Sequence, residues 1–377
     1  MNPNSFTLSR RNLLKLGVAT AGVATATAGV SLLPKIAFAK SVMEDWSKPF
    51  DIESARREAA IYTTYGMPDT WANYGEVLSL MAKKYDYKYQ HIDTDMGSME
   101  EILKYDAEKN NPVAISSDIG ILFGPVADER KVVPPYMPPS ASKLPKGLKG
   151  KEGGWVATFT GVPAMIVNTD IIKNVPESWE DLLKPEFTGK VSAIDASGMG
   201  GTSMATFIAW AYAFGGSETN LAPGAEFARK LLKQMSSAPT TTQTLERGEL
   251  PIQIKYDFNC IAQANALKAK GVNTRIIIPQ GTIYAPSATM INRYNVEKMN
   301  IAKVFLDFVL SDEAQIAFAK FGARPIRWVL GDLDLPEEAR KDWLPDEQYA
   351  HVHKIEDWSK VDVKKLAQFW VDEVVGG

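Results

Sequence analysis

Short apolar segments alternate with amphipathic helical segments along most of the chain, and this alternation limits the fold more than any other sequence feature. Segments typical of strands lie at about 59–65, 87–92, 118–122, 155–168, 191–195, 250–256 and 275–279. Segments with helical periodicity lie between or after them, at about 70–84, 99–109, 203–214, 225–235, 300–310, 312–321 and 363–374. Strands that alternate with helices predict an α/β fold with mainly parallel sheets and helices on both faces.

The length and the cysteine content add two limits. A chain of 377 residues is too long for one ordinary hydrophobic core, so we expect two lobes. The single cysteine, Cys260, excludes an internal disulfide and a cysteine-ligated cluster. The sequence also contains no dinucleotide fingerprint and no haem motif. We therefore expect neither a cofactor nor a metal.

Residues 1–39 have the three parts of a secretory signal. Arg10 and Arg11 precede an uncharged stretch over 16–33, and Ala37-Phe38-Ala39 supplies the small residues that signal peptidase needs. The arginine pair predicts a twin-arginine signal peptide and the twin-arginine translocase as a partner during export. The uncharged stretch could just span a bilayer, but its many Gly, Ala and Thr residues favour a signal cleaved near Ala39. We expect a periplasmic protein.

The charge of the mature chain argues against nucleic acid as a partner. Removal of residues 1–39 takes away four basic residues and no acidic ones, which lowers the formal net charge from −3 to −7. An acidic chain has no electrostatic basis for binding a polyanion. We expect a monomer that binds no nucleic acid.

The loops that follow the predicted strands indicate where a ligand would bind. In α/β sheets, ligands lie outside the carboxyl ends of the strands, where loops meet helix N-termini. Further candidates in these loops are Trp71, Asp95 and Gly120. The predicted ligand-binding residues are Thr64, Tyr65, Gly66, Gly97, Ser98, Asp118, Thr160, Ser197, Gly200, Gly201, Thr202, Ser203, Tyr256 and Asp257.

The loop at 197–203, with the sequence Ser-Gly-Met-Gly-Gly-Thr-Ser, is the most informative of these segments. Glycines let the backbone approach a ligand, and a helix N-terminus offers free N–H groups and a partial positive charge. Thr202 and Ser203 add hydroxyl donors. The loop therefore predicts a site for a phosphate, phosphonate or carboxylate, although a flexible helix cap without a ligand would have the same sequence.

Asp257 is the candidate partner for a positively charged group of the ligand. An anionic group on the glycine loop and an ammonium on Asp257 would suit an amino-phosphonate or a similar zwitterion. Asp257 is equally typical of a carboxylate that caps a loop. A polyamine would instead need several carboxylates in the cleft and would make little use of the glycine loop.

Six motifs follow one another over residues 61–327. They read I-Y-T-T-Y-G at 61–66, N-T-D at 168–170, P-E-S-W-E-D-L at 176–182, P-E-F-T-G-K-V at 185–191, A-K-V-F-L-D-F-V-L-S-D-E-A-Q at 302–315 and G-A-R-P-I-R at 322–327. In this order they resemble the type II periplasmic solute-binding proteins of ABC importers. The resemblance is to the branch that contains ferric-iron, polyamine, thiamine, sugar-phosphate and aminoethylphosphonate binders.

The resemblance implies two α/β lobes that are joined by a two-stranded hinge and close over one small-molecule solute. Lobe 1 would comprise residues 40–158 and 286–377, and lobe 2 residues 159–285. The chain would cross near 158–161 and return near 284–288. The closed form would dock on an ABC permease in the inner membrane, and the protein would not be an enzyme.

Three alternatives remain open beside a binder of anions, namely the polyamine binder named above, a ferric-iron binder and an enzyme. Family members that bind ferric iron directly use adjacent tyrosines, whereas this chain has only Tyr256 at the matching place; an iron–anion complex stays open. An exported serine hydrolase is a different class. The segment 201–205 approximates a nucleophile elbow, with Ser203 followed by His351 or His353, but its last position is Ala instead of Gly.

Overall fold

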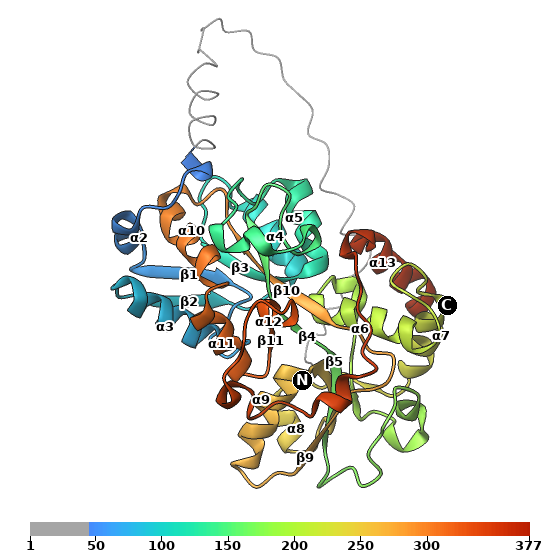
Figure 1. Ribbon diagram of the computed structural model, residues 1–377. Helices are drawn as coiled ribbons and strands as arrows, with labels where there is room; N and C mark the ends of the chain where they lie inside the picture. The colour runs from blue at the N-terminus through green and yellow to red at the C-terminus, as the bar shows by residue number, and fades with distance from the viewer. Residues whose placement is uncertain (1–44) are drawn as a thin grey trace, which may run out of the picture. The chain divides into compact units, whose positions relative to one another are not determined.

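Two mixed β-sheets organise residues 45–377, the part of the chain that the computed structural model describes (Figure 1). The predicted signal peptide and its cleavage site lie outside these residues. The first sheet has the strand order β11-β4-β10-β3-β1-β2, and the second has the order β7-β6-β8-β5-β9. The strands are β1 (Ile61–Tyr65), β2 (Gln90–Thr94), β3 (Ser116–Gly120), β4 (Trp155–Gly161), β5 (Pro163–Asn168), β6 (Val191–Ser192), β7 (Met235–Ser236), β8 (Ile252–Tyr256), β9 (Thr274–Ile277), β10 (Ala285–Ile291) and β11 (Arg324–Pro325).

Helices lie around both sheets, which confirms the α/β fold class. Among residues 45–377, no helix combines the length and the apolar character that crossing a bilayer requires. The α-helices are α2 (Ile52–Glu58), α3 (Tyr74–Tyr85), α4 (Ser98–Ala107), α5 (Gly124–Arg130), α6 (Gly201–Ala213), α7 (Ala222–Leu231), α8 (Thr242–Glu246), α9 (Asp257–Lys268), α10 (Met299–Phe308), α11 (Asp312–Lys320), α12 (Ile326–Val329) and α13 (Val363–Trp370).

The prediction of mainly parallel sheets is wrong. Strand β1 pairs in parallel with β2 and β3, and β6 pairs in parallel with β7 and β8. Strand β10 is antiparallel to β3 and β4, β11 is antiparallel to β4, and β5 is antiparallel to β8 and β9. The parallel pairs come from helix-connected units. Most of the antiparallel pairs come from strands that carry the chain between the two sheets.

The chain passes from the first sheet to the second through a single residue. Strand β4 ends at Gly161 in the first sheet and β5 begins at Pro163 in the second, so Val162 is the crossover. The return runs from β9 to β10, where the Thr282 hydroxyl donates to the carbonyl of Pro163 at 2.8 Å. The lobe boundaries at 158/159 and 285/286 stay a prediction.

Five helices were not expected: α2, α5, α8, α9 and α12. Two of them, α2 and α9, show the reason. Residues 40–58 read as a polar lead-in, yet α2 forms there because the Asp51 side chain caps it by accepting from the Ser54 N–H. Helix α9 begins directly after β8, where a loop was expected. Its apolar period is interrupted by Gln263, which is buried and donates to the Gln253 side chain. A buried polar residue weakens the pattern from which helices are predicted.

The C-terminal helix lies beside α6 and α7 of the second sheet, far from the strands that precede it in sequence (Figure 1). The Trp370 ring packs 5.0 Å from Phe207 and 6.4 Å from Trp210, centroid to centroid. The Arg229 guanidinium on α7 donates to the Glu373 carbonyl. Residues 363–375 therefore complete the core beneath α6.

Replacement of Trp370 by alanine tests this packing. The side chain is 1% exposed, so Trp370→Ala should lower the free energy of unfolding by about 3–5 kcal/mol through lost burial and the cavity left behind. Urea unfolding measures the change. Val371→Ala is the matched control, because Val371 is 43% exposed and should change stability by about 0.5 kcal/mol or less. Equal changes in the free energy of unfolding in the two variants would contradict the packing of Trp370 against α6.

Candidate ligand-binding site

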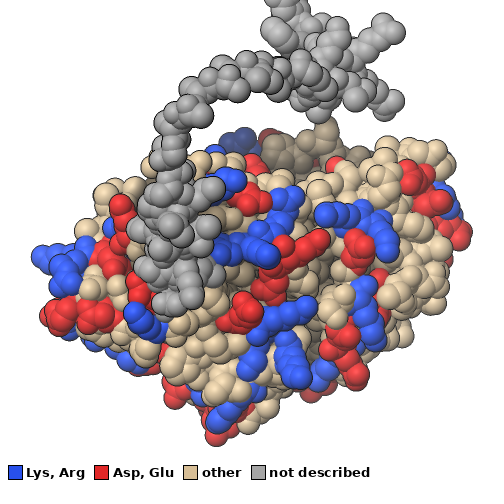
Figure 2. Space-filling view, turned by 90° about the horizontal axis from the view of Figure 1, so that it is seen from above, with Lys and Arg blue, Asp and Glu red and all other residues tan. Residues whose placement is uncertain are grey.

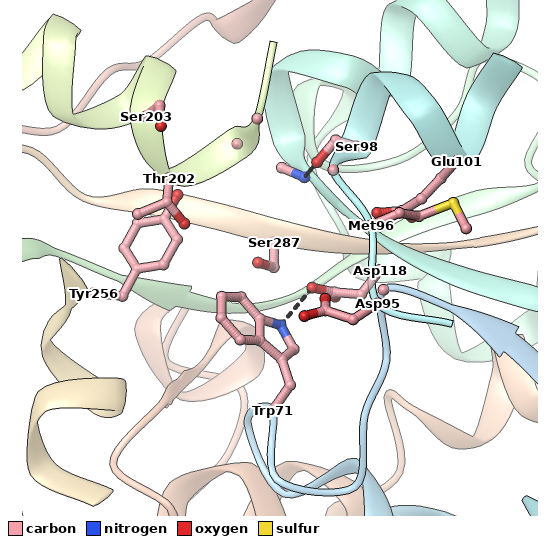
Figure 3. Close-up of a pocket in the computed structure, with 15 residues that line it drawn as sticks. Trp71, Asp95, Met96, Ser98, Glu101, Asp118, Thr202, Ser203, Tyr256 and Ser287 are labelled. Carbon is pink, nitrogen blue, oxygen red and sulfur yellow. Dashed lines mark hydrogen bonds between the residues drawn. The ribbon is translucent and has the colours of Figure 1, made fainter. Parts of the chain in front are cut away.

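A cavity of about 220 Å³ lies between the first sheet and the start of α6 (Figure 3). Fifteen residues line it: Gly66, Trp71, Asp95, Met96, Gly97, Ser98, Glu101, Asp118, Gly120, Gly200, Gly201, Thr202, Ser203, Tyr256 and Ser287. On one side, Gly66 follows β1, residues 95–97 follow β2, and Asp118 and Gly120 end β3. On the other side stand the start of α6 and the end of β8. The cavity is therefore at the carboxyl ends of parallel strands, where α/β sheets bind ligands.

Two helix N-termini open onto the cavity without side-chain caps. The N-cap residues are Gly97 for α4 and Gly200 for α6, and among the described residues no side chain caps either helix. The first N–H groups of a helix have no partner within the helix. Glycine at both N-caps leaves these donors free for a ligand or water, and the two helix dipoles add partial positive charge there.

Glycines bring the two sides of the cavity into close contact. A Cβ added at Gly120 would lie 3.2 Å from the Cα of Gly201. A Cβ added at Gly201 would lie 3.3 Å from both the Gly120 Cα and the Ser98 hydroxyl oxygen. The start of α6 therefore meets the end of β3 almost backbone to backbone.

Asp118 is held rigidly on the floor of the cavity. The Trp71 indole N–H donates to its Oδ2 at 2.7 Å, and the Tyr74 hydroxyl donates to its Oδ1 at 2.8 Å. Burial raises the pKa of Asp118 to about 7, and the hydrogen bonds from Tyr74 and Trp71 limit this rise. The carboxyl group therefore changes charge near neutral pH.

Glu101 places a second carboxyl group against the cavity. Its side chain is 1% exposed, and its Oε2 is buried without a hydrogen-bond partner among the described residues. Burial, and next the negative charge of Asp118, raises the pKa of Glu101 well above its usual range. The room for this carboxyl comes from Gly66 at φ +63°, where an added Cβ would lie 2.5 Å from Oε1.

Trp71 connects the two sides through aromatic contacts. Its ring lies edge-on to Phe258 at 5.4 Å and to Tyr256 at 6.4 Å, both at the junction of β8 and α9. The same indole donates to Asp118. Trp71 thus holds the Asp118 carboxyl of the first sheet and also contacts the two aromatic rings at the end of β8 in the second sheet.

Nine of the fourteen predicted ligand-binding residues line the cavity. The structure brings together both predicted helix starts and the ends of β1, β3 and β8. The nine are Gly66, Gly97, Ser98, Asp118, Gly200, Gly201, Thr202, Ser203 and Tyr256.

Three predicted residues near β1 and in the glycine loop have other partners. The Thr64 hydroxyl is hydrogen-bonded to His91 and Asp93 of the neighbouring strand β2. The Tyr65 hydroxyl donates to Glu108 at 2.7 Å. The Ser197 hydroxyl donates to Asp195 in the turn before α6. None of the three lines the cavity.

Thr160 and Asp257 lie at the crossover instead of in the cavity. Thr160 is buried in β4, and its hydroxyl donates to the Gly161 carbonyl. The Asp257 carboxylate accepts from the Val162 N–H at 2.9 Å and from the Tyr349 hydroxyl at 2.7 Å. Burial raises the pKa of Asp257, and the Arg324 guanidinium, 3.7 Å away, opposes the rise. Asp257 therefore holds the crossover and is absent from the lining of the cavity.

Sequence reasoning missed Met96, Glu101 and Ser287. Glu101 follows the N-cap Gly97 by four positions, so one turn of α4 brings it back to the same face; this spacing could have indicated it. Met96 is next to the candidate Asp95 but carries no polar signal. Ser287 comes from β10, which is distant in sequence, and nothing local marks it.

The geometry does not favour a hydrolase. Ser203 is in the first turn of α6, whereas the His353 ring packs on Tyr212 at 5.0 Å, nine positions further along the helix. This spacing corresponds to about 13 Å along the axis. The other candidate base, His351, has its Nε2 3.1 Å from the Ile278 carbonyl. The His353 ring is therefore far from Ser203 along α6, and the His351 Nε2 contacts a backbone carbonyl.

The order of motifs and the two-sheet fold agree with comparisons to known proteins. Residues 115–352 match the family of bacterial extracellular solute-binding proteins, which is more than half of the chain. The chain belongs to this family. This solute-binding protein is 28% identical over 253 residues to an uncharacterized protein of Haemophilus influenzae, covering 62% of this chain and 68% of that one.

A second relative and a solved structure extend the comparison. The solute-binding protein is 28% identical over 178 residues to the sulfate-binding protein of Escherichia coli, spanning 45% of this chain and 52%, about half, of the relative. Its fold is similar to that of AfuA from Actinobacillus pleuropneumoniae, a periplasmic binding protein solved with exogenous fructose-6-phosphate bound. That match has a TM-score of 0.65 and 21% identity, and covers 85% of this chain and 99% of AfuA. The predicted type II periplasmic-binding fold is confirmed.

The raised pKa of Asp118 predicts a pH dependence of stability. In the unfolded chain this carboxyl ionises near pH 4 and in the folded protein near pH 7. Between these values the folded state holds the extra proton, so its stability falls as pH rises, by at most about 1.4 kcal/mol per pH unit for this group. Urea unfolding of the ligand-free protein from pH 4.5 to 8 measures this dependence. The free energy of unfolding should fall less over this range in Asp118→Asn than in the wild-type protein.

The control for this measurement is Glu100→Gln, which also removes one carboxyl but from an exposed position on α4. It should keep the wild-type dependence on pH. If Asp118→Asn and wild type lose stability equally over the range, Asp118 is ionised in the folded protein at all these pH values, and the assignment fails.

The contact between Gly120 and Gly201 predicts the effect of a single methyl group. Gly120→Ala would push α6 away from β3, since neither backbone has a flexible side chain that could yield. Solute affinity should fall at least tenfold, which corresponds to about 1.4 kcal/mol. Calorimetric titration of a bound solute measures it. Gly198→Ala, where an added Cβ meets nothing within 4 Å, should bind like wild type.

Proposed function

We propose that this protein is the solute-binding component of an ABC importer and that its solute is small and anionic, bearing a phosphate, phosphonate or carboxylate group. The observation that carries this proposal is the pair of uncapped helix N-termini, α4 and α6, that open onto one cavity. The protein would deliver the solute to a permease in the inner membrane.

The cavity offers hydrogen-bond donors suited to anionic oxygens. The backbone N–H groups at the start of α6 are joined by the hydroxyls of Thr202 and Ser203, which Figure 3 shows on one side of the cavity. Ser98 and Ser287 add hydroxyls from the first sheet and its helix. Donors fixed by a backbone bind an anion without the entropy loss of ordering long basic side chains.

Relatives with anionic ligands in their printed names support the same class. The Escherichia coli relative is named a sulfate-binding protein, and AfuA was solved with fructose-6-phosphate. Both names concern those proteins and not this one. They support an anionic solute for this protein.

Capture would be a closure of the two sheets about the β4–β5 and β9–β10 connections. A solute held by α4 and α6 at once contacts both sides, so it favours the state in which they meet. The glycine contact at Gly120 and Gly201 would form only in that closed state, which the permease would then recognise. Export by the twin-arginine route, cleavage near Ala39 and a monomeric state belong to this proposal.

A polyamine is the second candidate solute, because three carboxyl-bearing residues line the cavity: Asp95, Glu101 and Asp118. Direct ferric-iron binding has less support. Tyr256 is the single tyrosine among the described lining residues. Within residues 45–377, no three acidic, His or Cys side chains are close enough together to hold a metal ion. A hydrolase is not supported, for the geometric reason given above.

A binding panel with a double variant tests the anion site. We expect a thermal shift with at least one of phosphate, sulfate, small phosphonates, sugar phosphates or small carboxylates, since a ligand at a hundred times its Kd stabilises the folded state by about 2.7 kcal/mol. Thr202→Ala combined with Ser203→Ala should weaken that ligand at least tenfold. Thr219→Ala, an exposed hydroxyl beyond α6, is the control and should bind normally.

Two outcomes would overturn the proposal. One is binding of putrescine or spermidine with silence from every anion. The other is unchanged affinity in the double variant, which would place the anion elsewhere. Both measurements use protein that has been unfolded and refolded first, so that solute carried through purification is removed.

A further inference from the structure

The cavity contains an excess of acidic groups that a simple anion does not explain. Asp95, Glu101 and Asp118, here called the acidic face, lie opposite Thr202 and Ser203 in Figure 3. Among the described residues, no Lys, Arg or His lines the cavity. The two helix N-termini together supply a partial charge on the order of one positive elementary charge. Because burial raises the pKa of both Glu101 and Asp118, these carboxyl groups ionise fully only beside a positive group, and a solute with negative charge alone would supply none.

Glu101 is the residue of this face that most clearly lacks a partner. Its Oε2 is buried and makes no hydrogen bond to any described residue. A buried polar atom without a partner costs about 1–3 kcal/mol. The carboxyl is not pushed into the core by crowding, because Gly66 leaves open the space that it occupies. A donor on the solute would satisfy it.

The neighbouring groups narrow the kind of donor. Both oxygens of Asp118 already accept hydrogen bonds from Trp71 and Tyr74, so Asp118 contributes charge more than a free acceptor. Within residues 45–377 no three acidic, His or Cys residues come together in a way that could hold a metal ion. A hydroxyl on the solute could satisfy Glu101 but would not offset the charge of the acidic face. A protonated amine does both.

We propose that the acidic face binds a protonated amine of the solute, so that the ligand is a small zwitterion. This inference rests on the proposed function, because the anionic group of the same molecule lies at the N-termini of α4 and α6. Glu101 accepts an N–H of the amine through Oε2. Asp118 and Asp95 provide the surrounding negative charge. Glu101 is then the residue that selects amine-bearing anions over simple anions.

Matched pairs of small molecules test the proposal in the full protein. The pairs are 2-aminoethylphosphonate with ethylphosphonate, O-phosphoethanolamine with ethyl phosphate, and β-alanine with propanoate. Within at least one pair, the amine-bearing member should bind at least tenfold more tightly by calorimetric titration. Glu101→Gln keeps the shape but removes the carboxyl group that can ionise beside the amine, so it should weaken the amine-bearing member at least tenfold and leave its partner within about threefold.

The control variant is Glu100→Gln, the exposed neighbour on the same helix, which should bind both members of the pair like wild type. Because Glu101 is buried, thermal unfolding first checks that Glu101→Gln is folded. If Glu101→Gln is unfolded, the affinities of the wild-type protein for the two members of each pair still test the proposal. The same affinities measured in Asp118→Asn test whether the acidic face contributes to the preference.

The outcomes separate this inference from the proposed function. Equal or tighter binding of the amine-free members would overturn the zwitterion inference and leave the anion site standing. A wild-type preference for the amine that persists in Glu101→Gln would overturn the role of Glu101. No binding of any member by protein that binds another anion of the panel would overturn the zwitterion inference alone. Binding of putrescine without any anion would overturn both proposals together.

Discussion

The fold depends on how the chain is held where it passes from one sheet to the other at Val162. The Asp257 carboxylate accepts from the Val162 N–H, and the Asp257 N–H donates to the Val162 carbonyl, so the crossover is fixed from the second sheet. The Tyr349 hydroxyl and the Arg324 guanidinium surround the same carboxylate. A buried carboxylate requires such partners, because an uncompensated charge there is strongly destabilising.

This anchored crossover sets where the two sides of the cavity meet. Strand β4 is in the first sheet and β5 in the second, so the position of Val162 determines how near α6 comes to β3. The meeting surface is made of glycines on both sides, which lets helix N–H groups approach a solute directly. The acidic face then supplies what helix ends lack, namely buried acceptors. The helix N-termini donate hydrogen bonds on one side of the site, and the acidic face accepts them on the other side. A bound solute would be oriented by this difference.

Local sequence predicted much of the fold and part of the site. The helix cap at Ser311, the helices over 299–320 and the loop after β1 follow from periodicity and turn residues. Asp257 shows where local reasoning fails: its position after a strand is that of a ligand residue, but burial beside Arg324 gives it a structural role. Glu101 shows the opposite failure, because local reasoning did not select it although it lines the cavity. On sequence alone it is one of two adjacent acidic residues at a helix start, and only one of them turns inwards.

The sequence by itself determined the α/β class, the family and the loops from which a site could be built, because strand and helix periodicities and the order of motifs are properties of neighbouring residues. Tertiary structure alone decided the antiparallel pairings, the docking of α13 on α6 and which fifteen residues share one cavity. Those outcomes depend on contacts between segments more than a hundred positions apart, such as Gly120 with β10 or Trp210 with Trp370. No local pattern encodes the distance between such segments, since it is fixed by packing and by the hydrogen bonds of the crossover.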